Sequence, residues 1–214
     1  HPWPREAREN LISLIGAGAA MIQIFEALDQ EEIIFHWIPE WSAVRSLPQR
    51  NVLHRHTVDR HMVETAVHAA ALTRQVHRPD ILLFSALFHD IGKGTEEDHS
   101  ERGERLIEPL AERIGFSSED IEIIKLLVKH HLLLSATATR RDLDDPATIA
   151  SVVEVIPNLQ VLELLHALSI ADGEATGRAA WTDWKASLVA ELVKRVELAI
   201  TDNTSKENPL PLIH

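Results

Sequence analysis

Apolar residues recur at the spacing of an α-helix along almost the entire chain, and no other feature restricts the fold as much. No segment shows the strict alternation of a half-buried strand, and no Asn-Gly turn joins two apolar runs. The 214 residues suffice for one domain with a sizeable core, since domains commonly hold about 100 to 200 residues. The pattern therefore predicts a single all-α unit.

Glycine, proline and capping residues divide this pattern into helices. Gly16 and Gly18 interrupt the first apolar segment, at about 5–28, which forms either one kinked helix or two. Proline and polar residues mark loops at 39–50 and at 135–145. We expect further helices at about 30–36, 57–76, 79–92, 98–114, 118–133, 158–174 and 179–200, and one that begins at Pro146 and ends before Pro157.

The chain is acidic and lacks cysteine. Its 33 acidic and 21 basic residues give a net charge of -12, which argues against binding to nucleic-acid phosphates or to a membrane surface. It has no apolar run near the ~18 residues of a membrane span, and its first residues, HPWPREAREN, do not resemble a signal peptide. We therefore expect a cytoplasmic protein without a nucleic-acid or membrane partner. Without thiolates, any metal must be held by carboxylates and by some of the 13 histidines.

The segment FSALFHDIGKGTEEDH ends an apolar helix with two ionisable side chains, His89 and Asp90. Burying such groups costs free energy unless a partner or a metal compensates it, so this pair requires one. Neighbouring side chains on a helix point about 100° apart, and both reach one ion only at the helix end, which Gly92 supplies. His61, on an earlier helix, and Asp172, near the end of a later apolar helix, are further candidate ligands.

Four sequence blocks carry a resemblance to a known family. The order of His61, then His89 with Asp90, then Asp172 resembles the HD superfamily of metal-dependent phosphohydrolases. Within it, the chain is similar to the HD domain of the bifunctional PII uridylyltransferase/uridylyl-removing enzymes, which implies an HD-domain helical bundle. The blocks are HRHTVDRH (54–61), HDIGKGTEEDHSERG (89–103), VKHHLLLSATATRRDLDDP (128–146) and SIADGEATG with AWTDWK (169–185).

The same resemblance implies three parts of the chain. They are an N-terminal helical lead-in at 1–40, the HD phosphohydrolase domain at 41–203 and a polar C-terminal tail at 204–214. One position departs from the family pattern, because His56 stands where the family usually has a tyrosine.

The resemblance also implies one or two metal ions that share a carboxylate. The ligands of a first ion would be His61, His89, Asp90 and Asp172, and those of a second would be Asp90, His99 and His131. His131 matches the family better than His130, because it directly precedes the run LLLS. The ions would be manganese or magnesium, although iron or zinc also suits ligands without sulfur. The remaining implied site residues are Asp90 and Lys93 as catalytic groups, and His54, Arg140 and Arg141 as substrate contacts.

These expectations imply a function. In the family, a nucleotidyltransferase domain attaches a nucleotide to a tyrosine of the PII nitrogen-signalling protein, and the HD domain removes it. The resemblance thus implies a metal-dependent phosphodiesterase that removes UMP or AMP from PII, flanked in the full-length chain by nucleotidyltransferase and glutamine-sensing ACT domains. Two alternatives stay open: an HD phosphohydrolase of a free nucleotide or alarmone, and a non-catalytic regulatory helical domain with a structural metal.

Overall fold

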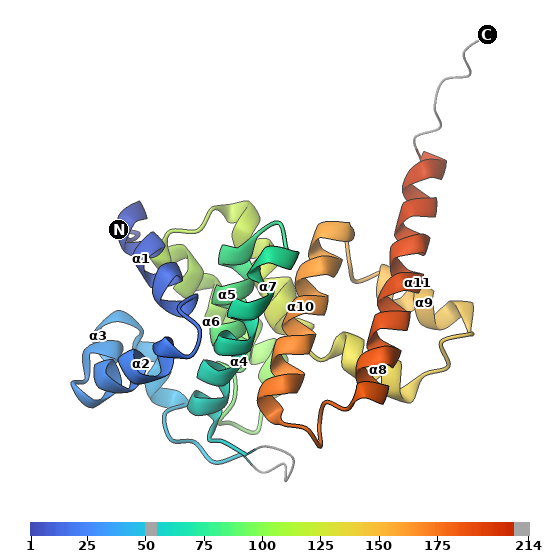
Figure 1. Cartoon of the computed structure of the whole chain (residues 1–214). Coiled ribbons are helices and arrows are strands. Elements are labelled where there is room, and N and C mark those ends of the chain that lie inside the picture. Colours follow the sequence, from blue (N-terminus) through green and yellow to red (C-terminus); the bar gives the residue numbers. More distant parts are fainter. Residues whose placement is uncertain (50–54, 208–214) are drawn as a thin grey trace.

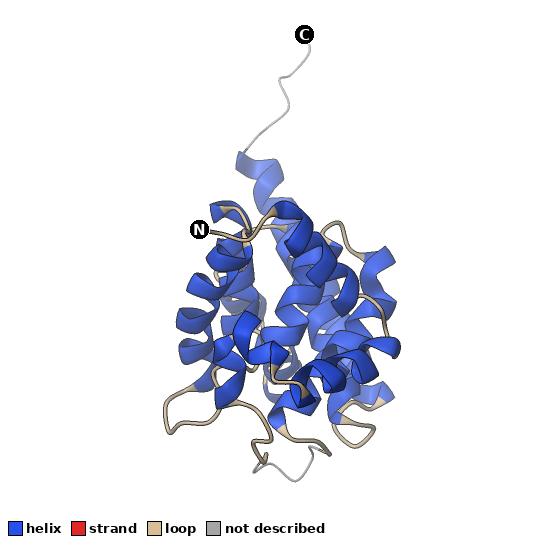
Figure 2. Cartoon of the chain, turned by 90° about the vertical axis from the view of Figure 1, so that its left-hand side faces the viewer, coloured by secondary structure: helices blue, strands red, loops and turns tan. Residues whose placement is uncertain are grey.

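The structure, a computed structural model, describes residues 1–49 and 55–207, and all regular structure in these ranges is helical (Figure 1). Figure 2 shows the same described ranges from the side, with helices and loops only. The predicted all-α class is confirmed. The α-helices are α1 (Arg5–Ile15), α2 (Ala20–Gln30), α3 (Ile33–Trp37), α4 (Val58–Leu72), α5 (Pro79–Phe88), α6 (His99–Ile114), α7 (Ser118–Lys129), α8 (Leu133–Arg140), α9 (Pro146–Val153), α10 (Leu159–Thr176) and α11 (Asp183–Glu207), and the 3-10 helices are η1 (Pro39–Ala43) and η2 (Thr73–Gln75).

α5 is the central helix. Every residue from Ile81 to Phe88 is buried, and the helix packs against α1, α4, α7 and α10. A helix that is apolar all round is stable only where other elements surround it. The chain is still inside the core where α5 ends, so His89, Asp90 and Ile91 are buried as well.

α4 and α10 pack against each other and against α5. Their inward positions are mostly apolar, such as Met62 on α4 and Leu165 on α10, and each fully buried side chain of this kind contributes about 1.5 to 3 kcal/mol. α8, α9 and α11 form the opposite end of the molecule from α1, α2 and α3 (Figure 1). The helices that carry His61, His89 and Asp172 are therefore neighbours in the centre.

The turn after α5 lies directly against α6 because it contains a glycine. A Cβ atom on Gly92 would be 2.0 Å from the carbonyl oxygen of His99 and 2.5 Å from the amide nitrogen of Gly103. Arg102 also binds this turn, since its Nη1 donates hydrogen bonds to the carbonyl oxygens of Gly92, at 2.9 Å, and Lys93, at 3.0 Å. These contacts place the first turn of α6 beside the end of α5.

The first apolar segment forms two helices, which settles the alternative left open above. α1 and α2 meet at a bend of 119°. As a bent pair they reach the length and apolar content of a membrane span, whereas no single helix among the described residues does.

Several helix boundaries differ from the prediction. The helix expected at 57–76 ends at Leu72, and the one expected at 79–92 ends at Phe88. The helix expected at 118–133 ends at Lys129, and α8 occupies much of the segment predicted as a polar loop. Leu134, Thr137 and Ala138 are buried at helical spacing, so this polar segment has one inward face. α11 continues to Glu207, past residue 203, where we placed the end of the HD domain. The division of the chain into three parts stays a prediction.

Candidate metal centre

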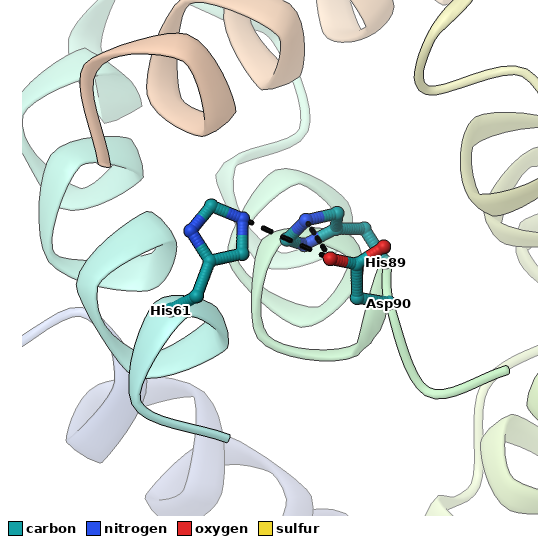
Figure 3. A group of neighbouring side chains, drawn as sticks. All are labelled: His61, His89 and Asp90. Carbon is teal, nitrogen blue, oxygen red and sulfur yellow. Dashed lines mark ion pairs between the residues drawn. The ribbon is translucent and has the colours of Figure 1, made fainter. Parts of the chain in front are cut away.

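Histidine and aspartate side chains from five places in the chain meet in the middle of the molecule. Figure 3 shows His61, from α4, pointing toward His89 and Asp90 at the end of α5. Asp172 comes from α10, His99 begins α6, and His131 lies in the break between α7 and α8. The buried members are His61, His89, Asp90 and His131.

Asp90 lies between two groups of histidines. Its Oδ2 atom is 3.4 Å from Nε2 of His89 and 3.8 Å from Nε2 of His61 (Figure 3). Its Oδ1 atom is 3.6 Å from Nε2 of His131 and 3.7 Å from Nε2 of His99. In each group, one donor atom per residue lies within 4.8 Å of the others. One carboxylate therefore faces two sets of imidazole nitrogens, one set through each oxygen.

Asp172 adds a second carboxylate to the first group. Its Oδ1 atom is 2.9 Å from Nε2 of His61 and 3.5 Å from Nε2 of His89. Its side chain is 16% exposed, against 3% for Asp90. Asp172 thus lies at the outer side of the cluster, and Asp90 lies inside it.

Backbone carbonyl groups fix the orientation of two of the rings. Nδ1 of His89 is 2.8 Å from the carbonyl oxygen of Ala86, and Nδ1 of His131 is 2.7 Å from that of Val128. A carbonyl oxygen only accepts, so Nδ1 is the donor in both bonds. In the neutral imidazole this leaves the lone pair on Nε2, the nitrogen that faces Asp90.

Burial and charge shift the pKa values of the cluster. Burial lowers the pKa of His131 to about 4, which keeps its imidazole neutral at neutral pH. Burial also disfavours the charged form of His89, but the carboxylates of Asp90 and Asp172 outweigh it and raise the pKa of His89 to about 10. Burial would raise the pKa values of the two carboxyl groups, yet His89 beside Asp90 and His61 beside Asp172 hold both well below their usual range. Without a metal, a charged His89 thus compensates two carboxylates.

The donor set fits a divalent metal ion. Nε2 of His89 and Oδ1 of Asp90 are buried and have no hydrogen-bond partner in the described part of the chain. Such atoms cost about 1 to 3 kcal/mol each when they stay unpaired, and coordination would remove that cost. Imidazole nitrogens and carboxylate oxygens are common ligands of divalent ions. The cluster could therefore hold a metal ion.

Lys93 brings a positive charge to the cluster. Its Nζ atom is 2.6 Å from Oδ2 of Asp90 and donates a hydrogen bond of 2.8 Å to Oε1 of Gln49. The two residues predicted as catalytic groups, Asp90 and Lys93, are thus in direct contact. Gln49 was not predicted, because a single glutamine in a loop carries no sequence signal.

The cluster borders a cavity of about 720 Å³, a size typical of ligand pockets. Arg140 lines this cavity, whereas Arg141, which follows the last residue of α8, is not among the described residues that do. His130 lines a separate cavity of about 310 Å³, so the structure places His131 at the cluster and His130 away from it. His54 lies outside the described residues. Members of the cluster that line the larger cavity are Asp90, His99, His131 and Asp172.

Comparisons with known proteins identify the family of this chain. A sequence model of the HD domain matches residues 58–174. The bifunctional uridylyltransferase/uridylyl-removing enzyme of Streptomyces coelicolor is 56% identical over 195 residues, which cover 91% of this chain and 23% of that enzyme. Enzymes of the same name from Mycobacterium tuberculosis and Vibrio vulnificus are 51% identical over 200 residues and 32% identical over 220 residues. These matches cover 93% and 96% of this chain, and 25% of each relative.

The chain thus spans about a quarter of the length of these relatives. The matched range extends over more than half of the chain and contains the whole histidine and aspartate cluster around Asp90. The chain therefore belongs to the HD domain family.

Proposed function

We propose that this chain is a metal-dependent phosphodiesterase that removes UMP or AMP from a tyrosine of the PII nitrogen-signalling protein. The observation that supports it most directly is the position of Asp90 between two sets of imidazole nitrogens. The relatives are named uridylyl-removing enzymes, which agrees with this activity. Nucleotidyltransferase and ACT domains would flank the chain in the full-length protein. Water would cleave the bond between the tyrosyl oxygen and phosphorus and yield the free tyrosine and a nucleoside 5′-monophosphate.

Two overlapping ligand sets would hold the metal. The first consists of His61, His89, Asp90 and Asp172, and the second consists of Asp90, His99 and His131. We propose manganese or magnesium, and iron or zinc accepts the same ligand types. When bound, such ions lower the pKa of coordinated water and neutralise charge on phosphoryl oxygens.

Residues of the chain would hold the imidazole ligands in place and balance the charge of the substrate. The hydrogen bonds from His89 and His131 to backbone carbonyl groups would hold the rings in place. Lys93, beside Asp90, would offset the negative charge of a phosphodiester that lies next to the cluster. A tyrosyl phenol has a reference pKa of ~10 and leaves more readily than an alkoxide, so a strong general acid is not required.

The charges around the cavity support a substrate with a single phosphodiester. The basic residues among those that line it are Lys93, Arg140 and Lys185, and Lys93 is paired with Asp90. Long nucleic acids need many lysine and arginine contacts with phosphates, and the chain carries a net charge of -12. We therefore propose that DNA and RNA are not substrates.

The experiment that tests this function measures nucleotide release from PII carrying either UMP or AMP on its tyrosine. We expect release with Mn²⁺ or Mg²⁺ and none with EDTA, and the faster of the two adducts identifies the nucleotide. Asp90→Ala should abolish release, whereas Asp202→Ala, on the exposed surface of α11, should not. Hydrolysis of free nucleotides with both adducts left intact would instead support the alternative of a free-nucleotide phosphohydrolase. Metal binding without hydrolysis of either substrate class would support a non-catalytic domain.

A further inference from the structure

Lys185 is a basic residue of the larger cavity, the one of about 720 Å³, and has no carboxylate partner among the described residues. It belongs to the first turn of α11, in the block AWTDWK, to which the function proposed above gives no role. Lys185 lines the same cavity as Asp90 and Asp172. Other lysines form ion pairs: Lys93 with Asp90, Lys125 with Glu108 and Glu122, and Lys129 with Glu104. No carboxylate of the described residues pairs with Lys185.

At Lys185 an aromatic ring occupies the place that a carboxylate has at Lys93, Lys125 and Lys129. Nζ of Lys185 lies over the indole of Trp181, 5.7 Å from the ring centroid. The face of an indole attracts a cation without carrying a negative charge. The indole therefore orients the ammonium group and leaves its net charge available to the cavity.

The indole is itself held against α10, at the residue that follows Asp172. Gly173 follows Asp172 on α10, and a Cβ atom on Gly173 would lie 2.3 Å from Cε3 of Trp181. Only a residue without a side chain allows the ring this close to the backbone of α10. Trp181 thus connects Lys185 to the residue next to a proposed metal ligand.

We propose that Lys185 binds the anionic phosphodiester of the substrate, with Trp181 as the residue that positions it. This inference rests on the proposed function, in which the phosphodiester lies beside Asp90 and Asp172. Lys185 would then supply, from α11, a positive charge that no carboxylate in the described part of the chain neutralises. Lys93 would act from the turn after α5, where it is already in contact with Asp90.

Binding of defined probes to the Mn²⁺-loaded protein tests the proposal by isothermal titration calorimetry. The probes are UMP, inorganic phosphate and uridine, which lacks the phosphate. Lys185→Gln should weaken the binding of UMP and phosphate by about tenfold or more, because a hydrogen bond to a charged group is lost. Binding of uridine and of Mn²⁺ itself should stay unchanged. Lys185→Arg should retain most of the UMP affinity.

Lys194→Gln is the matched control, since Lys194 lies on the same helix, is exposed and does not line the cavity. It should bind all probes like the unmodified protein. Equal UMP binding by Lys185→Gln and Lys194→Gln would overturn the proposal, and so would an equal loss of uridine binding. Failure of the unmodified protein to bind UMP or phosphate would also overturn it. Turnover of nucleotidylated PII is measured separately, so a wrong protein substrate can be distinguished from a wrong role for Lys185.

Discussion

Replacing Gly92 by alanine should weaken the binding of a second metal ion and spare the first. The added Cβ would lie 2.0 Å from the carbonyl oxygen of His99, and real Cβ atoms essentially never come closer than 3.0 Å to such a neighbour. The first turn of α6 must therefore move by about 1 Å away from the end of α5, whose own position is fixed by the helices packed around it. Metal sites tolerate changes in ligand distance of about 0.2 Å, so the shift is several times larger than His99 can absorb as a ligand.

The other proposed ligands should be less affected. His61, His89 and Asp172 come from α4, the end of α5 and α10, and none of them lies on α6. Gly92 is not among the residues with positive φ, so alanine introduces no conflict in its own backbone conformation. Overpacking of this kind costs about 1 to 3 kcal/mol, which should lower the melting temperature without unfolding the chain.

Mn²⁺ titration followed by electron paramagnetic resonance counts the ions and their affinities. We expect two classes of site in the unmodified protein, and a second class weakened by about tenfold or more in Gly92→Ala. Gly16→Ala is the control, because its Cβ would meet only the flexible end of Leu83 at 3.1 Å and the turn carbonyls of its own helix at 3.3 Å or more. A folded Gly92→Ala protein that binds two ions with unchanged affinities would refute the reasoning.

Three further predictions concern the ligands directly. Asp90→Ala should reduce Mn²⁺ binding at both sites, because one carboxylate serves both, and retention of either site in a titration would contradict its shared position. His131→Ala should weaken only the second site and His130→Ala neither, as site counting would show; equal losses would mean that the two histidines act together. Since His89 has a pKa of about 10, metal binding near pH 7 should release about one proton, and the apparent affinity should rise up to about tenfold per pH unit. Calorimetry in buffers of different ionisation enthalpy measures that proton, and a pH-independent affinity would count against it. In the metal-free protein the same shift stabilises the fold fully below pH ~6.5, and this contribution is lost as the pH rises toward about 10.

Much of the fold could be predicted because its main signal is local. The continuous apolar run of α5 requires neighbours on all sides, and the structure supplies them. The helix α8 was missed because its inward face consists of Leu134, Thr137 and Ala138, two of which are small or polar. Hydrophobic periodicity detects such a face poorly, and the contacts of α8 with α11, α10 and α9 explain its burial.

The candidate site, too, could be predicted only in part. The resemblance identified residues that the structure brings together, but the geometry among them depends on packing between distant helices. Asp172 approaches His61 across 111 positions of the chain, and Gln49 approaches Lys93 across 44. No local pattern encodes either approach. The choice of His131 over His130 likewise depends on the helix break after Lys129, which turns one histidine inward and the other toward a different cavity.

Because α5 is buried on all sides, the number of its residues determines where His89 and Asp90 point. Each residue inserted into or deleted from α5 would turn His89 and Asp90 by about 100° about the helix axis and shift them by about 1.5 Å. Neighbouring helices surround α5, so it cannot rotate back to compensate. The linker between α1 and α2 carries no ligand and should tolerate changes in length. Among homologous chains, length variation should therefore occur in that linker, while the spacing from Pro79 to Asp90 stays constant.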